Sequence, residues 1–74
     1  MTPGRLGSVR PKDFIRKLSR AGYRVDHQSG SHAILINDAG IRLTVPVHAR
    51  EMKRGLLVSL LKQAALTPDE FRDL

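Results

Sequence analysis

The chain has 74 residues, of which 41% are apolar, and it has no cysteine. This length predicts one domain with a small core, and the lack of cysteine excludes disulfides and cysteine-bound zinc as sources of stability. The 13 Lys and Arg against 7 Asp and Glu give a formal net charge of +6, which favours a nucleic acid, an anionic membrane surface or an acidic protein as the partner.

Nothing in the sequence predicts export or insertion into a membrane. The apolar runs are far shorter than the roughly 18 residues that span a bilayer, and residues 1–6 lack the apolar core of a signal peptide. We therefore expect a cytoplasmic protein without a membrane partner. One Tyr and two Phe are too few for a sheet that binds RNA by stacking several bases on aromatic side chains.

Residues 1–10 show no periodicity and predict a flexible N-terminal arm, so that residues 11–74 form the single domain. Pro11 suits the first position of a helix, because its missing N–H would have no partner there. Apolar residues recur at helical spacing up to Ala21, and Gly22 suits the left-handed position that follows a helix. The pattern predicts a helix over residues 11–21.

The middle of the chain predicts three short strands joined by tight turns. Residues 23–28 and residues 41–45 alternate apolar-leaning with polar side chains, which is typical of strands with one buried face. Between them, residues 31–37 contain an unbroken apolar run, which predicts a central strand covered on both faces. Turns are expected at Ser29-Gly30 and at Asp38-Ala39-Gly40.

The last part of the chain predicts two more helices. A helix that begins at Met52 or Arg54 and ends near Ala65 is indicated by apolar residues at helical spacing: Leu56, Leu57, Leu60, Leu61 and Ala64. Thr67-Pro68-Asp69-Glu70 has the spacing of a capping box with proline at the first helical position. It predicts a short final helix that places Phe71 against the core.

The expected order is helix, three strands, helix, and a short C-terminal helix. Strands joined by short turns form an antiparallel sheet, and helices on both sides of them in sequence pack on one of its faces. The fold class is therefore α+β, with the layout of a double-stranded-RNA-binding domain. This layout alone does not establish a function, because one fold serves many functions.

Gly30-Ser31-His32 is the first candidate site. Histidine gains and loses a proton near neutral pH, Gly30 lets the backbone turn tightly or approach a substrate, and the Ser31 hydroxyl can bond a phosphate oxygen or order the turn. Beside a basic surface, His32 could take the proton of an RNA 2′-OH, so that the RNA supplies its own nucleophile. The alternative is that His32 merely fills a strand position. We expect it at the open end of the strand, by the turn, where it can reach solvent.

A second group of candidates surrounds the predicted start of the helix near residue 54. Arg50, Lys53, Arg54 and Lys62 are expected to bind phosphate together with the N–H groups of the helix, or simply to face solvent. His48 is either a second acid–base group, a phosphate contact or a structural loop residue. His27 is assigned no role.

Other chemistries find no support in the pattern. Ser31 and His32 are adjacent, and neighbouring side chains of a strand point to opposite faces, which argues against a hydrolase triad. Three scattered histidines without cysteine do not predict a metal site. We therefore expect no metal and no cofactor.

Taken together, the order and spacing of these motifs resemble the HicA (YcfA-like) toxins over about residues 11–71. The resemblance rests on Lys12-Asp13-Phe14-Ile15, Leu18, Ala21-Gly22-Tyr23, Gln28-Ser29-Gly30-Ser31-His32, Val45-Pro46-Val47-His48, Glu51-Met52-Lys53-Arg54-Gly55-Leu56-Leu57, Leu60-Leu61-Lys62-Gln63-Ala64 and Pro68-Asp69-Glu70-Phe71. Two positions depart from the family pattern. Ala33 stands where many members have a second histidine, and Gly55-Leu56-Leu57 replaces a common Gly-Thr-Leu.

The resemblance implies an mRNA interferase with a double-stranded-RNA-binding-like fold, the toxin of a type II toxin–antitoxin pair. It implies that His32 is catalytic and that a HicB-like antitoxin covers this histidine. The expected function is metal-independent cleavage of mRNA, without DNA contact by this chain alone. The substrate-binding residues are expected to be Gly30, Ser31, His48, Arg50, Lys53, Arg54 and Lys62. The alternatives are a non-catalytic RNA-binding module and an inactive remnant that binds only an antitoxin.

Overall fold

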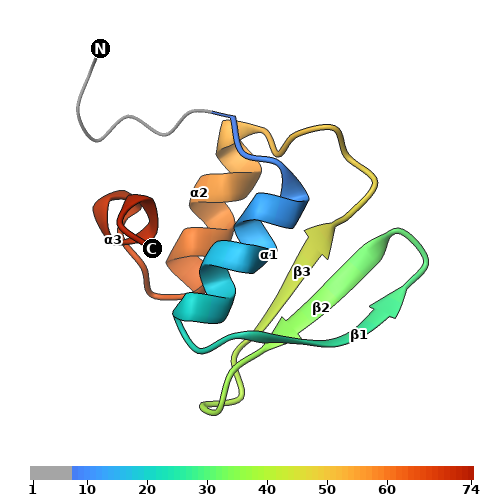
Figure 1. Ribbon diagram of the computed structural model, residues 1–74, viewed down its shortest axis with the longest axis horizontal. Helices are drawn as coiled ribbons and strands as arrows, with labels where there is room; N and C mark the ends of the chain where they lie inside the picture. Colours follow the sequence, from blue (N-terminus) through green and yellow to red (C-terminus); the bar gives the residue numbers. More distant parts are fainter. Residues whose placement is uncertain (1–7) are drawn as a thin grey trace.

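The computed structural model describes residues 8–74, in which three helices lie to one side of a three-stranded sheet (Figure 1). The sheet is antiparallel with the order β1-β2-β3, so the predicted α+β class and the double-stranded-RNA-binding type of layout are confirmed. The elements are α1 (Pro11–Arg20), β1 (Arg24–Ser29), β2 (His32–Ile36), β3 (Arg42–Pro46), α2 (Arg54–Gln63) and α3 (Pro68–Arg72).

Helix α1 begins at Pro11, as its missing N–H allows, and ends at Arg20, one residue before the predicted end. Phe14 and Leu18 lie one turn apart and are fully buried. Gly22 follows with φ +92°, a left-handed conformation that reverses the chain toward β1. The apolar stripe of the sequence is thus the face of α1 that packs into the core.

The two faces of the sheet differ. Ala33 and Leu35 on β2 pair with Val45 and Leu43 on β3, and all four are at most 2% exposed under the helices. The alternate residues of β2, beginning with His32, lie on the opposite face, which we call the open face. The prediction that β2 is covered on both faces is therefore wrong. The strand is central, but all the helices pack on the same side of it.

Strand β1 lies at the edge of the sheet, and all six of its residues are exposed. The expectation that this strand has one buried face is therefore wrong, because no helix covers it. Its register with β2 shifts between Val25, which is opposite Leu35, and His27, which is opposite Ile34. Asp26 therefore has no partner in the ladder and forms a β-bulge. This bulge determines which side chains of β1 lie together on the open face.

Helices α2 and α3 complete the core. Leu57, Leu60 and Leu61 of α2 are at most 2% exposed. The capping box predicted for α3 is present: Thr67 Oγ1 accepts from the Glu70 N–H at 3.1 Å, and Glu70 Oε1 accepts from the Thr67 N–H at 2.8 Å. Each helix buries the apolar side that the sequence indicated, with the exception of Leu56 in α2, which is 36% exposed.

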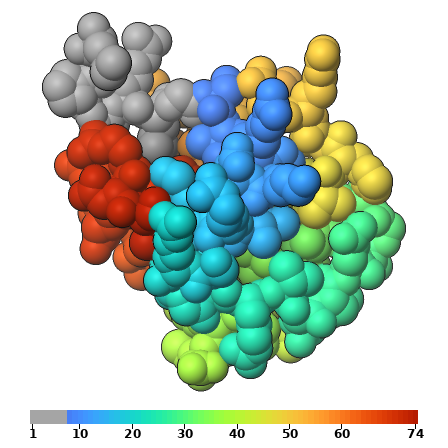
Figure 2. Space-filling model, viewed as in Figure 1, coloured from blue at the N-terminus to red at the C-terminus, as the bar shows by residue number. Residues whose placement is uncertain are grey.

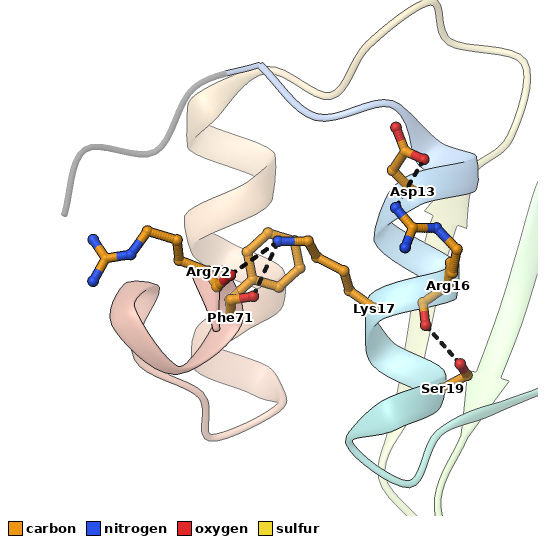
Figure 3. A network of polar contacts seen from close by, with 6 residues as sticks. All are labelled: Asp13, Arg16, Lys17, Ser19, Phe71 and Arg72. Atoms are coloured by element: carbon orange, nitrogen blue, oxygen red, sulfur yellow. Dashed lines mark hydrogen bonds and ion pairs between the residues drawn. The ribbon is translucent and has the colours of Figure 1, made fainter. Parts of the chain in front are cut away.

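Lys17 docks α3 onto α1, as Figure 3 shows. Its ammonium group donates to the carbonyl oxygens of Phe71 at 3.4 Å and Arg72 at 3.3 Å, and lies 4.8 Å from the centre of the Phe71 ring. The Phe71 ring lies 5.5 Å from that of Phe14. The positive charge of Lys17 is stabilised by the carbonyl dipoles at the C-terminus of α3 and by the face of the aromatic ring. The surfaces of α3 and α1 accordingly touch in Figure 2.

A single antiparallel bridge joins the segments that precede α1 and α2. The Met52 N–H donates to the Val9 carbonyl at 2.7 Å, and Met52 is 1% exposed. The bridge brings the starts of the two long helices together. Residues 1–7 of the predicted arm lie outside the described residues.

Tyr23, the residue before β1, is buried, with 4% of its surface exposed. Its hydroxyl has no hydrogen-bond partner among residues 8–74, and burial raises its pKa above the ordinary value of a tyrosine.

Within the same residues, no helix is long and apolar enough to cross a bilayer.

Candidate functional site

The Gly30-Ser31-His32 corner is held by the turn between β1 and β2 and by the end of β3. Gly30 has φ +58°, and a Cβ atom added to it would meet no other atom within 4 Å, so the backbone conformation and not the available space favours glycine. The Ser31 carbonyl accepts from the Val47 N–H at 2.8 Å. In Figure 2 the green hairpin tip and the yellow segment after β3 lie next to each other at this edge.

His32 is the first residue of β2 and is exposed on the open face, since its neighbour Ala33 is buried against the helices. The sequence predicted this accessible place by the turn. The Ser31 hydroxyl lies 3.4 Å from His32 Nδ1. The argument that these side chains point apart is therefore wrong, because Ser31 lies in the turn and not in the strand.

This contact does not make a hydrolase triad. Among the hydrogen bonds and ion pairs of residues 8–74, none joins a carboxylate to His32. The Ser31 hydroxyl can order one ring nitrogen of His32, which leaves Nε2 for a solvent molecule or a substrate. The corner thus offers one accessible group that can transfer a proton.

The structure brings most of the predicted phosphate contacts to one end of the molecule. His48 follows Val47, which is bonded to Ser31, and Arg50 lies in the same exposed connection. Lys53 is the N-cap residue of α2 and Arg54 its first residue, and no side chain caps the helix there. All four side chains are exposed and cationic or titratable, so this end can receive the phosphates of an extended strand.

Lys62 is not part of this group. It lies in the last turn of α2, about 12 Å along the axis from Arg54 at 1.5 Å per residue. Arg10, which sequence analysis missed, lies nearer: it lines a cleft with Arg50 and Glu51. Its position depends on the bridge between Val9 and Met52, and no local sequence pattern signals such a bridge.

A second titratable cluster lies on the open face and was also missed. His27 Nδ1 is 2.7 Å from Asp26 Oδ2, and Arg42 of β3 approaches the same carboxylate oxygen at 4.0 Å. The hydrogen bond from His27, followed by the charges of His27, Arg42 and Arg24, lowers the pKa of Asp26 below its ordinary value. Strand alternation puts adjacent residues on opposite faces, and only the bulge lets Asp26 turn toward its neighbour.

The fold and this surface define a small basic domain of the double-stranded-RNA-binding type with an accessible histidine at one corner of its sheet. Residues 11–66 match the model of a family described as the HicA toxin of bacterial toxin–antitoxin systems. Because the match covers more than half of the chain, the protein belongs to the HicA toxin family. None of the curated proteins compared with the chain matches it significantly.

Proteins of this family are toxins that are paired with antitoxins, and this protein is therefore one of them. Helix α3, which Lys17 clamps onto α1, lies beyond the matched residues. The site residues predicted from the sequence, Gly30 to Lys62, fall inside the match, whereas Arg10 lies just before it.

Proposed function

We propose that this protein is a metal-independent endoribonuclease that cleaves mRNA and thereby stops translation and growth. The observation that carries the proposal is the position of His32, exposed at the end of the open face within reach of the Ser31 hydroxyl. Membership of a toxin family supports the biological role, and the net charge of +6 supports an anionic substrate.

In the proposed reaction the RNA supplies the nucleophile. The 2′-oxygen attacks the adjacent phosphorus, the bond from phosphorus to the 5′-oxygen breaks, and the products are a 2′,3′-cyclic phosphate and a 5′-OH. His32 acts as a general base or a general acid for one of the two proton transfers. No metal is needed to generate a hydroxide, since the 2′-OH takes the place of water.

The neighbouring groups would hold the phosphates. The backbone of Gly30 and the Ser31 hydroxyl flank the histidine, and His48, Arg50, Lys53 and Arg54 extend the anion-binding surface toward the start of α2. Lys62 could contact only a more distant phosphate. Binding by several such cations predicts a steep dependence of affinity on salt.

The partner we propose is a HicB-like antitoxin that covers His32 and this cationic surface. Acidic side chains on the antitoxin would complement the positive charge, and covering the open end of the sheet would exclude RNA. We propose that both proteins act in the cytoplasm, where mRNA is translated, and that this chain alone does not contact DNA.

The test is cleavage of single-stranded RNA in EDTA by the wild-type protein and by His32→Ala. We expect wild-type cleavage with a 2′,3′-cyclic phosphate product, and a loss of about 100-fold or more in the variant. Gln63→Ala, an exposed position on α2, is the control for folding and should cleave normally. Equal cleavage by His32→Ala, or cleavage only with a divalent metal, would show that the mechanism is wrong.

A non-catalytic RNA-binding module is the second candidate, because the fold itself is the layout of a duplex-RNA binder. Tight, salt-sensitive binding of duplex RNA without any cleavage product would favour it over the nuclease.

A further inference from the structure

His27 and His32 share the open face of the sheet. His27 of β1 lies opposite Ile34 of β2, and His32 lies two residues from Ile34 along the same strand. Paired and alternate positions face the same side, so the two histidines are diagonal neighbours. Diagonal positions in an antiparallel pair lie about 7–8 Å apart at the backbone, with somewhat less between their Cβ atoms.

This separation suits two groups that act on one phosphate. In the transfer proposed above, the attacking 2′-oxygen and the leaving 5′-oxygen lie on opposite sides of the phosphorus, roughly in line. Each needs a proton acceptor or donor within about 2.6–3.2 Å. Two histidines that start from positions about 7–8 Å apart can place their rings on either side of a phosphate, whereas directly opposite positions would bring the rings closer together.

Asp26 gives His27 a defined orientation. The hydrogen bond of 2.7 Å places the ring proton on Nδ1 and leaves the lone pair of Nε2 unbonded. A carboxylate in this position also stabilises the imidazolium ion that forms when the ring accepts a proton. The side chain of His27 remains 55% exposed, so Nε2 is accessible to a substrate.

Arg42 and Arg24 act directly on the Asp26 carboxylate, and His32 and Asp38 are the other titratable groups on the elements around the Asp26–His27 pair. Arg42 of β3 lies 4.0 Å from the Asp26 carboxylate, Arg24 of β1 adds a second positive charge, and His32 lies on β2. Asp38, at the turn after β2, is bonded to Arg24 at 3.1 Å. Without the arginines, the Asp26 carboxylate would repel a phosphate. With them, the cluster can hold an oriented histidine beside an anion.

We propose that His27, oriented by Asp26, is the general base of the RNA-cleaving site and that His32 is its general acid. His27 Nε2 accepts the proton of the 2′-OH as the bond between the 2′-oxygen and phosphorus forms. His32 donates a proton to the 5′-oxygen as its bond to phosphorus breaks. One proton is taken and one is given, and exchange with water restores both rings. The inference rests on the proposed nuclease activity.

His48 is the other histidine near this end of the sheet, and it lacks the feature that favours His27. His48 lies in a turn after β3. The carboxylate that orients a histidine here is that of Asp26, and its hydrogen bond goes to His27. A variant at His48 therefore serves as a direct competitor in the test.

The experiment uses an RNA oligonucleotide cut by the wild-type protein in EDTA, made with either oxygen or sulfur as the 5′ leaving atom. Sulfur leaves as a thiolate without being protonated, because a thiol is a stronger acid than an alcohol, with a pKa of about 8.5 in cysteine. The sulfur substrate therefore does not need a general acid. We expect His27→Ala to lose about 100-fold or more on both substrates and to be restored several-fold by added imidazole. We expect His32→Ala to be slow with oxygen and close to the wild type with sulfur.

Two further variants separate this chemistry from a structural effect. Val25→Ala changes the same strand on its other, helix-facing side, where Val25 is 47% exposed, and should match the wild type on both substrates without responding to imidazole. Asp26→Asn should lower kcat with little change in KM, and imidazole should not restore it, because the ring is still present.

The possible failures are distinct. If the wild-type protein does not cut either RNA in EDTA, the proposed function and this inference fall together. If the wild type cuts but His27→Ala keeps the wild-type rate or is not restored by imidazole, the nuclease stands and the role of His27 is wrong. The same conclusion follows if His48→Ala, and not His27→Ala, loses cleavage on both substrates and is restored by imidazole. Recovery of His27→Ala with the sulfur substrate would show that its role as the base is wrong.

Discussion

Removing the hydroxyl of Tyr23 should stabilise the protein. This hydroxyl is buried and has no partner among residues 8–74, and an unsatisfied buried polar group costs about 1–3 kcal/mol relative to its hydrated state. Tyr23→Phe keeps the ring and removes that cost, so we expect a gain of about 1 kcal/mol in the free energy of unfolding. In a domain of this size, 1 kcal/mol raises Tm by about 4–8 °C.

The pH dependence of stability provides a second readout of the same substitution. Burial raises the pKa of Tyr23 in the folded state, so the folded protein holds this proton more tightly than the unfolded chain does. The stabilisation is complete below the ordinary tyrosine pKa of about 10 and is lost as the pH rises through the raised value. Urea titrations of both proteins from pH 7 to 11 should show the phenylalanine variant losing less stability above pH 10. Destabilisation by Tyr23→Phe would show that the hydroxyl has a hydrogen-bond partner, and identical alkaline curves would show that burial does not raise its pKa.

Three other substitutions test contacts described above. Lys17→Met removes the ammonium group from two carbonyls and a ring and should cost about 1–2 kcal/mol in denaturant unfolding, whereas Lys12→Met on the exposed side should stay within about 0.5 kcal/mol. Asp26→Asn should lose less stability than the wild type as the pH falls below about 4. The pKa of Asp26 is lowered in the folded state, so its carboxylate stabilises the protein above the ordinary aspartate pKa and loses this effect on acidification. An unchanged acid titration would contradict the pairing with His27. Gly30→Ala should cost about 1–2 kcal/mol at φ +58°, while Gly55→Ala in helix α2, with no atom within 4 Å of the new methyl group, should gain up to about 1 kcal/mol by calorimetry. Equal effects of the two glycine substitutions would show that backbone conformation does not decide them.

The order of elements could be predicted because local chemistry marks their ends. Pro11 begins α1, Gly22 with its positive φ follows it, and Thr67 with Glu70 forms the box that begins α3. Each of these signals depends on the geometry of a few consecutive residues. The coverage of β2 could not be predicted in this way, because an apolar run does not show on which side the helices pack.

The part of the site that could be predicted is the part that depends on a few consecutive residues. His32 was expected at an accessible corner, since the turn before it is a local feature, and the structure has it there. Arg10 approaches Arg50 only through a bridge between residues 43 positions apart, from 9 to 52. The pairing of Asp26 with His27 depends on a shift of register, which arises from how two strands meet and not from either strand alone.

The bulge at Asp26 also affects how copies of this protein meet one another. An edge strand with free N–H and C=O groups is a template on which a second strand can pair, and successive copies can then grow into an aggregate. In β1 the register shift bends the backbone in the middle of the strand, and charged Arg24 and Asp26 lie near its exposed edge. A matching strand could follow this edge for only a few residues. The irregularity that brings a carboxylate to a histidine therefore also shortens the stretch of β1 on which a second copy could pair.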